Sequence, residues 1–201
     1  ESIVAEARRL VQDGVKELNL ISQDTINYGV DLGLKQGLTA LLRELVAVED
    51  ARWIRPFYLY PQQVTDELLD LYAGEARITK YLDMPLQHIS DNMLKAMKRQ
   101  ITREEMEALV TGIREAVPGI CLRTTLITGF PGETLEDVEE LKRFLQKMRF
   151  DRVGIFTYSH EENTHAFALE DDVPEEENIF KEFVFTDAGF KAWLNLILKN
   201  E

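Results

Sequence analysis

The segment Leu126–Glu133, with the sequence LITGFPGE, constrains the fold more than any other part of the chain. An apolar strand runs into a glycine-proline turn, and a helix begins directly after Thr134. A turn with few side chains lets a ligand lie against backbone amides. In barrels and open α/β sheets, ligands bind at this carboxyl end of the strands. The segment therefore predicts a ligand site on an α/β scaffold.

The composition is typical of one soluble globular domain. The 201 residues are 45% hydrophobic and 29% charged, which suffices for a sizeable core. The sequence has no apolar run of the roughly 20 residues that span a bilayer and no signal peptide, so we expect a cytoplasmic protein without a membrane partner. The net charge of -13 argues against direct nucleic-acid binding. It suits a basic protein partner or a small molecule, or simply a soluble surface.

Helical and strand patterns alternate along the first 160 residues. We predict strands over residues 15–22, 53–60, 78–84, 120–128 and 152–158. Helices are predicted over residues 1–13, 38–48, 66–73, 91–98, 102–117 and 134–148. Repeated βα units of this length predict a parallel sheet, either open or curled towards a barrel.

Short polar residues mark the starts of the later helices. Thr65, Ser90 and Thr134 occupy N-cap positions, and Thr102 with Glu105 forms a capping box. Apolar residues at helical spacing predict the buried side of the last of these helices: Leu135, Val138, Leu141, Leu145 and Met148.

We expect residues 1–160 to form the core domain. Residues 161–177 are rich in Glu and Asp and are predicted to be an acidic connection. Residues 178–201 contain an amphipathic run from Phe190 to Leu198. That run forms either a helix that packs on the domain or a helix that binds a partner.

Strand alternation places polar side chains on one face of the sheet. In the strand 120–128 one face is apolar. The opposite face carries Cys121, Arg123, Thr125 and Ile127. An arginine that points into a barrel needs an anionic partner, because a buried charge without one is costly. The first strand is likewise followed by Gln23 and Asp24, so these polar groups form either a ligand pocket or a buried network with a structural role.

Histidines and the single cysteine offer few further sites. Gln87 and His88 follow the strand 78–84, where His88 is either a structural loop residue or part of a site at the active edge. His160 and His165 are five residues apart, not four, so they do not share a helical face and we expect no zinc site. Cys121 lies within a strand and is expected to be a small core side chain.

Four segments, in order and at ordinary spacing, resemble the radical S-adenosylmethionine methylthiotransferases. They are LISQDTINYG (20–29), YLDMPLQHIS (81–90), LITGFPGE (126–133) and FTYSHEENTHA (156–166), and the resemblance covers residues 1–177. The pieces Gln87-His-Ile-Ser-Asp and Gln23-Asp-Thr are similar to the branch that modifies an aspartate of a small-subunit ribosomal protein. The alternatives are the tRNA adenosine methylthiotransferases and a non-catalytic binding domain of barrel type.

The resemblance implies an α/β fold, a partial TIM-like (βα)6 barrel that binds S-adenosyl-L-methionine across its strand ends. It also implies a [4Fe-4S] cluster and a 5′-deoxyadenosyl radical that abstracts hydrogen from the β-carbon of the aspartate, before sulfur insertion and methyl transfer. By position, Gln23 would receive the methionine amino group of the cofactor, with Arg123 and Thr125 on its carboxylate and ribose side. The other expected cofactor-binding residues are Asp24, Gln87, His88, Ile127, Gly129, Phe156 and Tyr158.

The chain also departs from that family. The family holds its cluster with a CxxxCxxC loop after the first barrel strand, whereas this sequence has one cysteine and begins on the helix that should follow. We therefore expect a catalytic core without its first strand, which is inactive as a fragment. Asn163 stands where the family has glycine, and residues 178–201 do not continue the family pattern.

Overall fold

The computed structural model describes residues 2–162, 165–169 and 183–185. The chain divides into two compact units: Glu1–Met84 with Thr111–Cys121, and Pro85–Val110 with Leu122–Glu201. Asn163, the run from Phe190 to Leu198 and most of the acidic connection lie outside the described residues. None of the described helices is long and apolar enough to cross a membrane.

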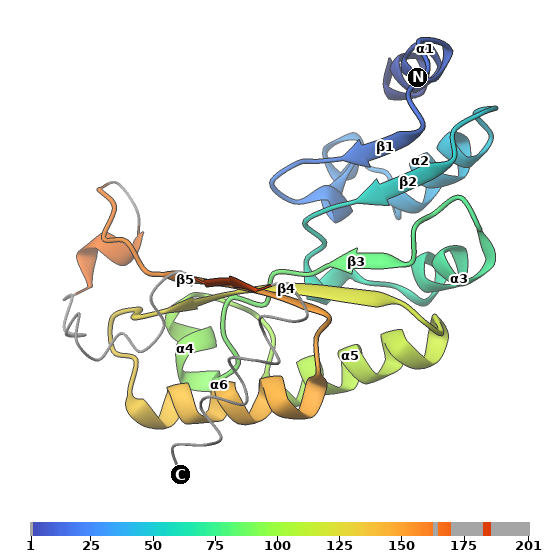
Figure 1. Ribbon diagram of the computed structural model, residues 1–201. Coiled ribbons are helices and arrows are strands. Elements are labelled where there is room, and N and C mark those ends of the chain that lie inside the picture. Colours follow the sequence, from blue (N-terminus) through green and yellow to red (C-terminus); the bar gives the residue numbers. More distant parts are fainter. Residues whose placement is uncertain (1, 163–164, 170–182, 186–201) are drawn as a thin grey trace. The chain divides into compact units, whose positions relative to one another are not determined.

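In residues 1–84 of the first unit, three helices alternate with three strands. Its elements are α1 (Ser2–Gln12), β1 (Glu17–Leu20), α2 (Gly37–Val46), β2 (Trp53–Pro56), α3 (Asp66–Gly74) and β3 (Tyr81–Asp83). Short turns of 3-10 helix, η1 (Thr25–Asn27), η2 (Val30–Leu32) and η3 (Pro61–Gln63), stand in its loops. β1 and β2 pair in parallel, with Leu18 opposite Ile54 (Figure 1). Both of these side chains are buried, so one face of the pair belongs to the core.

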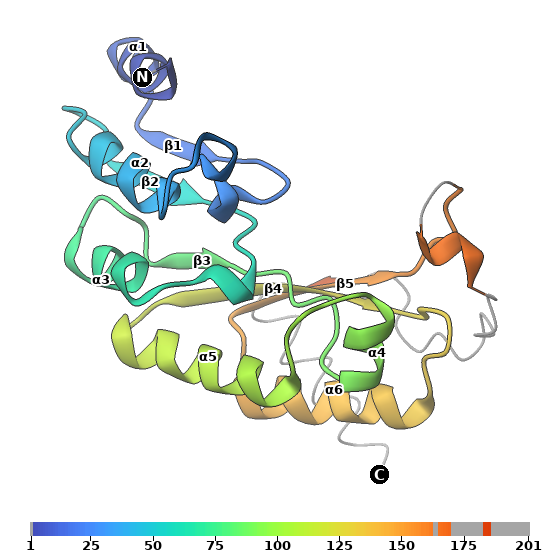
Figure 2. The same ribbon diagram turned by 180° about the vertical axis from the view of Figure 1, so that it is seen from behind.

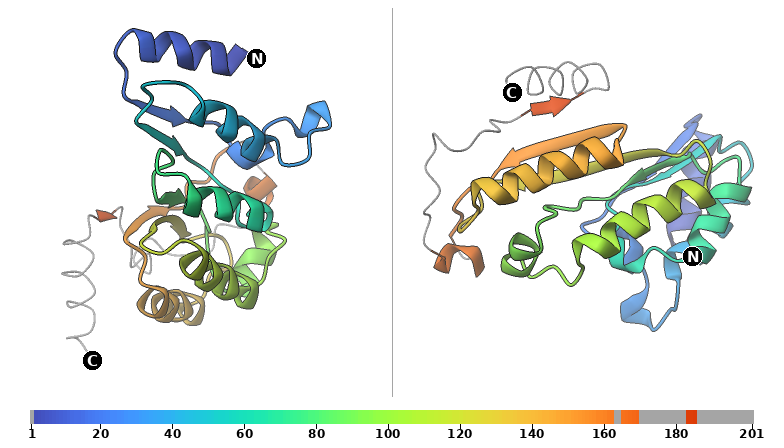
Figure 3. Two further views of the ribbon diagram at one scale, coloured as in Figure 1. Left: turned by 90° about the vertical axis from the view of Figure 1, so that its right-hand side faces the viewer. Right: turned by 90° about the horizontal axis from the view of Figure 1, so that it is seen from below.

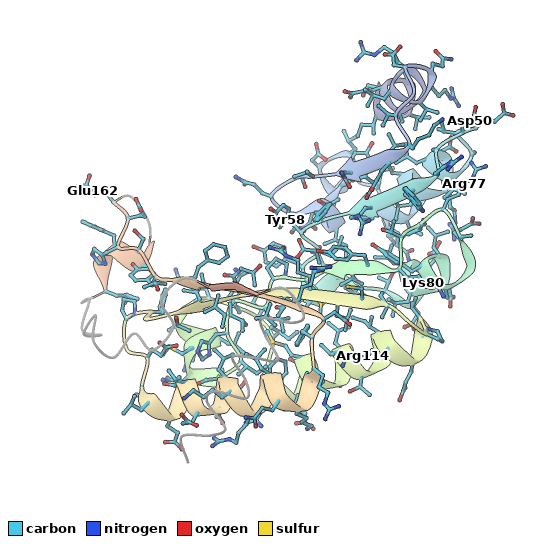
Figure 4. All side chains as sticks on the ribbon, in the orientation of Figure 1. Asp50, Tyr58, Arg77, Lys80, Arg114 and Glu162 are labelled. Atoms are coloured by element: carbon cyan, nitrogen blue, oxygen red, sulfur yellow. The ribbon has the colours of Figure 1, made fainter. Side chains whose placement is uncertain are left out.

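The strands of this unit are shorter than predicted. β2 ends at Pro56, and Tyr58 has a left-handed backbone with φ of 57°. An extended strand cannot continue through that conformation. In Figure 4, Tyr58 lies beyond the carboxyl end of β2, whereas Asp50 and Arg77 lie near the strand starts.

The second unit is built on β4 (Cys121–Thr128) and β5 (Arg152–Thr157). Its other elements are α4 (Asp91–Ala96), α6 (Leu135–Met148), η4 (His165–Ala168) and β6 (Phe183–Phe185), and α5 (Arg103–Ala116) belongs to both units. β4 and β5 are parallel, as predicted, and β6 adds an antiparallel strand that the sequence did not predict. Helices α4 and α6 cover the same face of β4 and β5 (Figures 1 and 2), and α6 runs along the strands (Figure 3).

The predicted buried side of α6 is confirmed except at its first residue. Val138, Leu141, Leu145 and Met148 are buried, but Leu135 is 59% exposed. Helical side chains lean towards the helix amino terminus, and Leu135 is the first residue of α6. Its side chain therefore projects beyond the covered part of the sheet.

Three of the four predicted helix caps form side-chain cap bonds. The hydroxyl of Thr65 accepts from the amide of Leu68, Thr102 and Glu105 form their capping box, and Thr134 caps α6. Ser90 stands at the predicted N-cap position of α4, but its side chain makes no cap bond there. Its hydroxyl instead donates to a buried carboxylate of α6, that of Asp137.

Alanine substitution of two helix glycines tests the packing, because the two changes should shift the free energy of unfolding in opposite directions. A Cβ on Gly37 would lie 2.0 Å from the carbonyl oxygen of Tyr28, whereas a Cβ on Gly112 meets nothing within 4 Å. We expect Gly37→Ala to lower the free energy of unfolding by about 3 kcal/mol because the clash is with backbone. Gly112→Ala should raise it by about 0.5–1 kcal/mol through helix propensity. Urea unfolding measures both, and equal effects would contradict this packing.

Candidate functional site

The face of β4 and β5 that is turned away from α4 and α6 is only partly covered. Parallel register aligns its side chains in three pairs: Arg123 with Arg152, Thr125 with Gly154, and Ile127 with Phe156. The β4 residues are half-buried, and Phe156 is 44% exposed. The predicted division of β4 is confirmed, because Leu122, Thr124, Leu126 and Thr128 are buried on the other face. The second unit therefore presents a cationic, polar and aromatic surface.

Gly154 leaves a side-chain position empty in the middle of this surface. A Cβ there would lie 3.5 Å from Cε2 of Phe156, 3.8 Å from Oγ1 of Thr125 and 3.9 Å from Nη2 of Arg123. Gly154 is buried, and a methyl group there would be in ordinary van der Waals contact with all three side chains. A guanidinium, a hydroxyl and an aromatic ring thus surround one small space.

The loop after β3 extends this surface alongside β4. Gln87 has φ of 71°, and its amide donates to the carbonyl of Thr125 at 2.9 Å. The amide of Ile127 donates in turn to the carbonyl of Gln87 at 2.7 Å. This parallel bridge holds Gln87 beside the two β4 residues that face the open surface.

The turn after β4 and the residues after β5 form an aromatic edge. The amide of Tyr158 donates to the carbonyl of Thr128 at 2.8 Å, which carries the pairing past the end of β5. The rings of Tyr158 and Phe130 meet edge to face, with centroids 5.1 Å apart. The ring of His160 follows. Its centroid lies 6.0 Å from that of the Tyr158 ring and 4.7 Å from that of the Phe167 ring. Aromatic side chains therefore line the carboxyl end of this strand pair, and Glu162 stands further along the same loop (Figure 4).

His88 is fully buried and both of its ring nitrogens are bonded. Nδ1 accepts from the amide of Ser90 at 3.0 Å, which assigns the proton of a neutral ring to Nε2. Nε2 donates to Oε1 of Glu133 at 2.9 Å, and Oε2 of Glu133 accepts from the amide of Gly129 at 2.5 Å. The histidine therefore ties the loop after β3 to the LITGFPGE turn.

A second buried link joins the same two segments. The Ser90 hydroxyl donates to Oδ1 of Asp137, and the amide and hydroxyl of Thr134 donate to Oδ2 at 2.9 and 2.7 Å. Burial pushes the pKa of Asp137 upwards, but the hydrogen bonds from Ser90 and Thr134 outweigh it and hold this pKa below its ordinary value. Asp137 is therefore ionised and fully bonded at neutral pH.

The first unit has a polar face of its own. Nε of Arg55 donates to Oε1 of Glu17 at 2.6 Å, and the guanidinium carbon lies 4.8 Å from the ring centroid of Tyr81. Asp83 is fully buried, and its carboxylate accepts from the amide of Tyr58 at 3.3 Å. Sequence analysis missed these residues. Strand alternation would have found Arg55, because it puts Arg55 on the face of the strand that the buried Ile54 does not share.

Gln23 and Asp24 follow β1 in the first unit. Gln23 is exposed, and Asp24 accepts from the side-chain amide of Asn27. The other carboxylate oxygen of Asp24 is buried and has no partner among the described residues. Asp24 also lines a hollow of ≈ 670 Å³ between α1, β1 and α2.

The remaining eight predicted site residues belong to the second unit. Gln87, Arg123, Thr125, Ile127 and Phe156 gather along the β4–β5 face, and Gly129 and Tyr158 lie at its carboxyl edge. His88 lies beneath this edge, bonded to Glu133. Sequence analysis missed Glu133, Asp137 and Gly154, because each acts through a partner distant in the chain.

Comparison with known proteins defines the class. Residues 1–145 match the family model of the radical SAM superfamily, and the chain belongs to that superfamily. It is 53% identical over 176 residues to the protein named ribosomal protein uS12 methylthiotransferase RimO of Flavobacterium johnsoniae, covering 88% of this chain and 40% of that one. The protein of the same name from Lachnoclostridium phytofermentans is 52% identical over 173 residues, with 86% and 39% covered. The chain thus spans about 40% of the length of these relatives.

Solved structures confirm the fold. The radical S-adenosylmethionine methyltransferase TsrM of Kitasatospora setae, solved with cobalamin and a [4Fe-4S] cluster, has a TM-score of 0.61 at 22% identity, covering 78% of this chain and 30% of that one. The radical SAM coproporphyrinogen III oxidase HemN of Escherichia coli has a TM-score of 0.56 at 17% identity, with 98% and 44% covered. The predicted α/β class, a partial TIM-like radical SAM fold, is therefore correct.

Substitution of His88 tests the first buried link. We expect His88→Ala to lower the free energy of unfolding by about 2–3 kcal/mol, because the buried carboxylate of Glu133 loses a hydrogen-bond donor. His160→Ala is the matched control, since His160 is exposed, and should change stability by less than about 0.5 kcal/mol. Urea unfolding of both variants provides the comparison. Similar losses in the two would refute the proposed link.

Acidification tests the second link. The pKa of Asp137 is lower in the folded state, so its ionised form stabilises the fold above the unfolded pKa of about 4. This contribution is lost as the pH falls through the folded pKa. Asp137→Asn should cost about 1–2 kcal/mol at neutral pH, and the difference from wild type should shrink below about pH 4. The control Glu136→Gln, at an exposed neighbouring position, should show neither effect. A difference that does not depend on pH would contradict this assignment.

Proposed function

We propose that the protein containing this chain is a cytoplasmic radical SAM methylthiotransferase that modifies an aspartate of ribosomal protein uS12 at its β-carbon. The observation that carries this proposal is 53% identity over 88% of the chain to a relative with that ribosomal protein in its name. Because the chain spans about 40% of such relatives, the activity and the substrate are proposed for the whole protein. The aspartate comes from the motif resemblance.

We place S-adenosyl-L-methionine on the second unit at the carboxyl edge of β4 and β5. The cofactor supplies the radical initiator and the methyl group in this family. Backbone groups of Ile127 and Gly129, with the exposed ring of Phe156 and the ring of Tyr158, offer a surface suited to a purine. Gln87 is held beside Ile127, within the same surface. The described residues therefore fit this cofactor.

The assignments of Gln23 and Asp24 in the first unit to the cofactor stay predictions. So does the assignment of Arg123 and Thr125 to its carboxylate and ribose side. His88 differs from these residues, because both of its ring nitrogens are already bonded. We propose that His88 is a positioning residue, which fixes the turn at Gly129 through Glu133.

A [4Fe-4S] cluster does not fit the residues of this chain. Iron-sulfur clusters are held by several cysteine thiolates, whereas the sequence contains Cys121 alone. Among the described residues, no three His, Cys, Asp or Glu side chains group as metal ligands. We therefore propose that the cluster belongs to other parts of the whole protein, and we derive no step through it.

Ribosome analysis tests the function. A strain that lacks its own uS12 methylthiotransferase would be complemented with the full-length protein, and intact uS12 would be weighed by mass spectrometry. We expect a mass increase of one methylthio group on uS12. An unmodified uS12 together with a new methylthioadenosine in tRNA would establish the alternative substrate instead. No mass increase on either substrate would reject methylthiotransferase activity.

Phe156 tests the placement of the cofactor. In the full-length protein with its cluster, Phe156→Ala should weaken S-adenosylmethionine binding about tenfold, because the purine loses an aromatic contact. Leu135→Ala is the control, since Leu135 is also an exposed apolar side chain, at 59% against 44% for Phe156, but directly follows the cap of α6. Equilibrium dialysis with labelled cofactor gives both dissociation constants. An unchanged dissociation constant in Phe156→Ala would show that the purine does not bind on this face.

A further inference from the structure

A hollow at the amino end of the strands in the first unit is lined mainly by cations. Its volume is ≈ 430 Å³, and its lining consists of Lys16, Asp50, Ala51, Arg52, Ala76 and Arg77. Three cationic side chains therefore stand against one carboxylate, in a chain whose net charge is -13. The two alanines contribute no long side chain to the space. This local excess of positive charge makes the hollow a candidate site for an anion.

Backbone pairing brings the three cationic residues to one edge. Lys16 directly precedes β1, and Arg52 directly precedes β2. The carbonyl of Lys16 accepts from the amides of Arg52 and Trp53 at 3.0 and 3.1 Å. The carbonyl of Arg77 accepts from the amide of Ile54 at 2.8 Å. Lys16 and Arg77 therefore flank the start of β2 on its two sides, and Figure 4 shows Arg77 at this end of the unit.

Most donor groups of these cations have no partner in the described part of the chain. Nη1 of Arg77 donates to the carbonyls of Val46 and Val48 at 2.8 and 2.9 Å, which holds this guanidinium beside the carboxyl end of α2. Its Nε and Nη2 make no hydrogen bond or ion pair with a described residue. The same holds for Nζ of Lys16 and the guanidinium of Arg52. Like charges that are held together repel one another, and a bound anion offsets that repulsion.

We propose that this hollow binds a phosphate group, of a small molecule or of a free phosphate ion, through Lys16, Arg52 and Arg77. Lysine and arginine form strong charge-assisted hydrogen bonds to phosphate oxygens. A phosphate monoester carries about two negative charges at pH 7, which matches three cations beside one carboxylate. A carboxylate group brings one charge and would leave more of the cations unpaired. The site belongs to the first unit alone and does not depend on the proposed function.

Lys16 and Arg52 allow a test that leaves the fold intact, because both side chains are exposed and lack partners among the described residues. In the full-length protein, Lys16→Gln and Arg52→Gln should each weaken binding of inorganic phosphate about tenfold, since each removes a charge-assisted hydrogen bond. Lys35→Gln is the matched control, because it removes the same charge from an exposed position that lines a different hollow of the same unit. It should change the affinity less than about twofold. Isothermal titration calorimetry at constant ionic strength gives the dissociation constants.

Asp50→Asn should act in the opposite direction. Asp50 has φ of 65°, a left-handed backbone that asparagine also tolerates, so this variant should fold normally. Removal of the one carboxylate in the lining should strengthen phosphate binding about threefold. Equal phosphate affinity in wild type, Lys16→Gln and Arg52→Gln would overturn the proposal. So would an affinity that stays the same or falls in Asp50→Asn.

Two probes distinguish the sources of the phosphate group. Inorganic phosphate and ribose 5-phosphate are titrated separately, with ribose as the control for contacts of the sugar. Tighter binding of ribose 5-phosphate that is lost in Arg52→Gln would assign the hollow to a phosphorylated small molecule. Binding of inorganic phosphate alone would assign it to the free ion. Saturable binding of neither probe to the wild-type protein would reject the site, whereas methylthio transfer to uS12 would still test the proposed function separately.

Discussion

A pair of buried hydrogen-bonded links between two loops holds the candidate site together. His88 bonds Glu133, and Ser90 bonds Asp137, so the loop after β3 is joined twice to the turn and helix after β4. Buried carboxylates are stable only when their oxygens are bonded, so both links require their partners in place. The position of Gly129, and with it the carboxyl edge of the sheet, depends on these contacts.

The chemistry of the open face follows from parallel register and from one missing side chain. Register brings Arg123 beside Arg152 and Thr125 beside Gly154. At the buried Gly154 the neighbouring side chains leave room for no more than a methyl group. Among the described elements of the second unit, the helices α4 and α6 cover the opposite face (Figures 1 and 2). The polar side chains therefore lie on the strands, while the loops at the carboxyl edge present backbone amides and carbonyls.

Local patterns predicted most of the elements correctly. The βα order, the alternation of β4 and the caps at Thr65, Thr102 and Thr134 depend on residues a few positions apart, which a sequence displays directly. Sequence patterns did not predict side-chain partners that come from distant parts of the chain. Ser90 has the residue type of a cap, but a carboxylate from 47 positions later takes its hydroxyl. The cofactor-binding roles of the site residues stay predictions, whereas their positions follow from the hydrogen bonds described above.

The sequence by itself determined the superfamily, the order of strands and helices, and which face of β4 is polar, because these depend on residue type and short-range period. Tertiary structure alone decided which polar groups meet. His88 and Glu133 are 45 residues apart, and Gly154 matters only because β5 aligns it with Thr125. Such partners are chosen by strand register and burial, which bring together residues whose spacing in the chain carries no periodic signal.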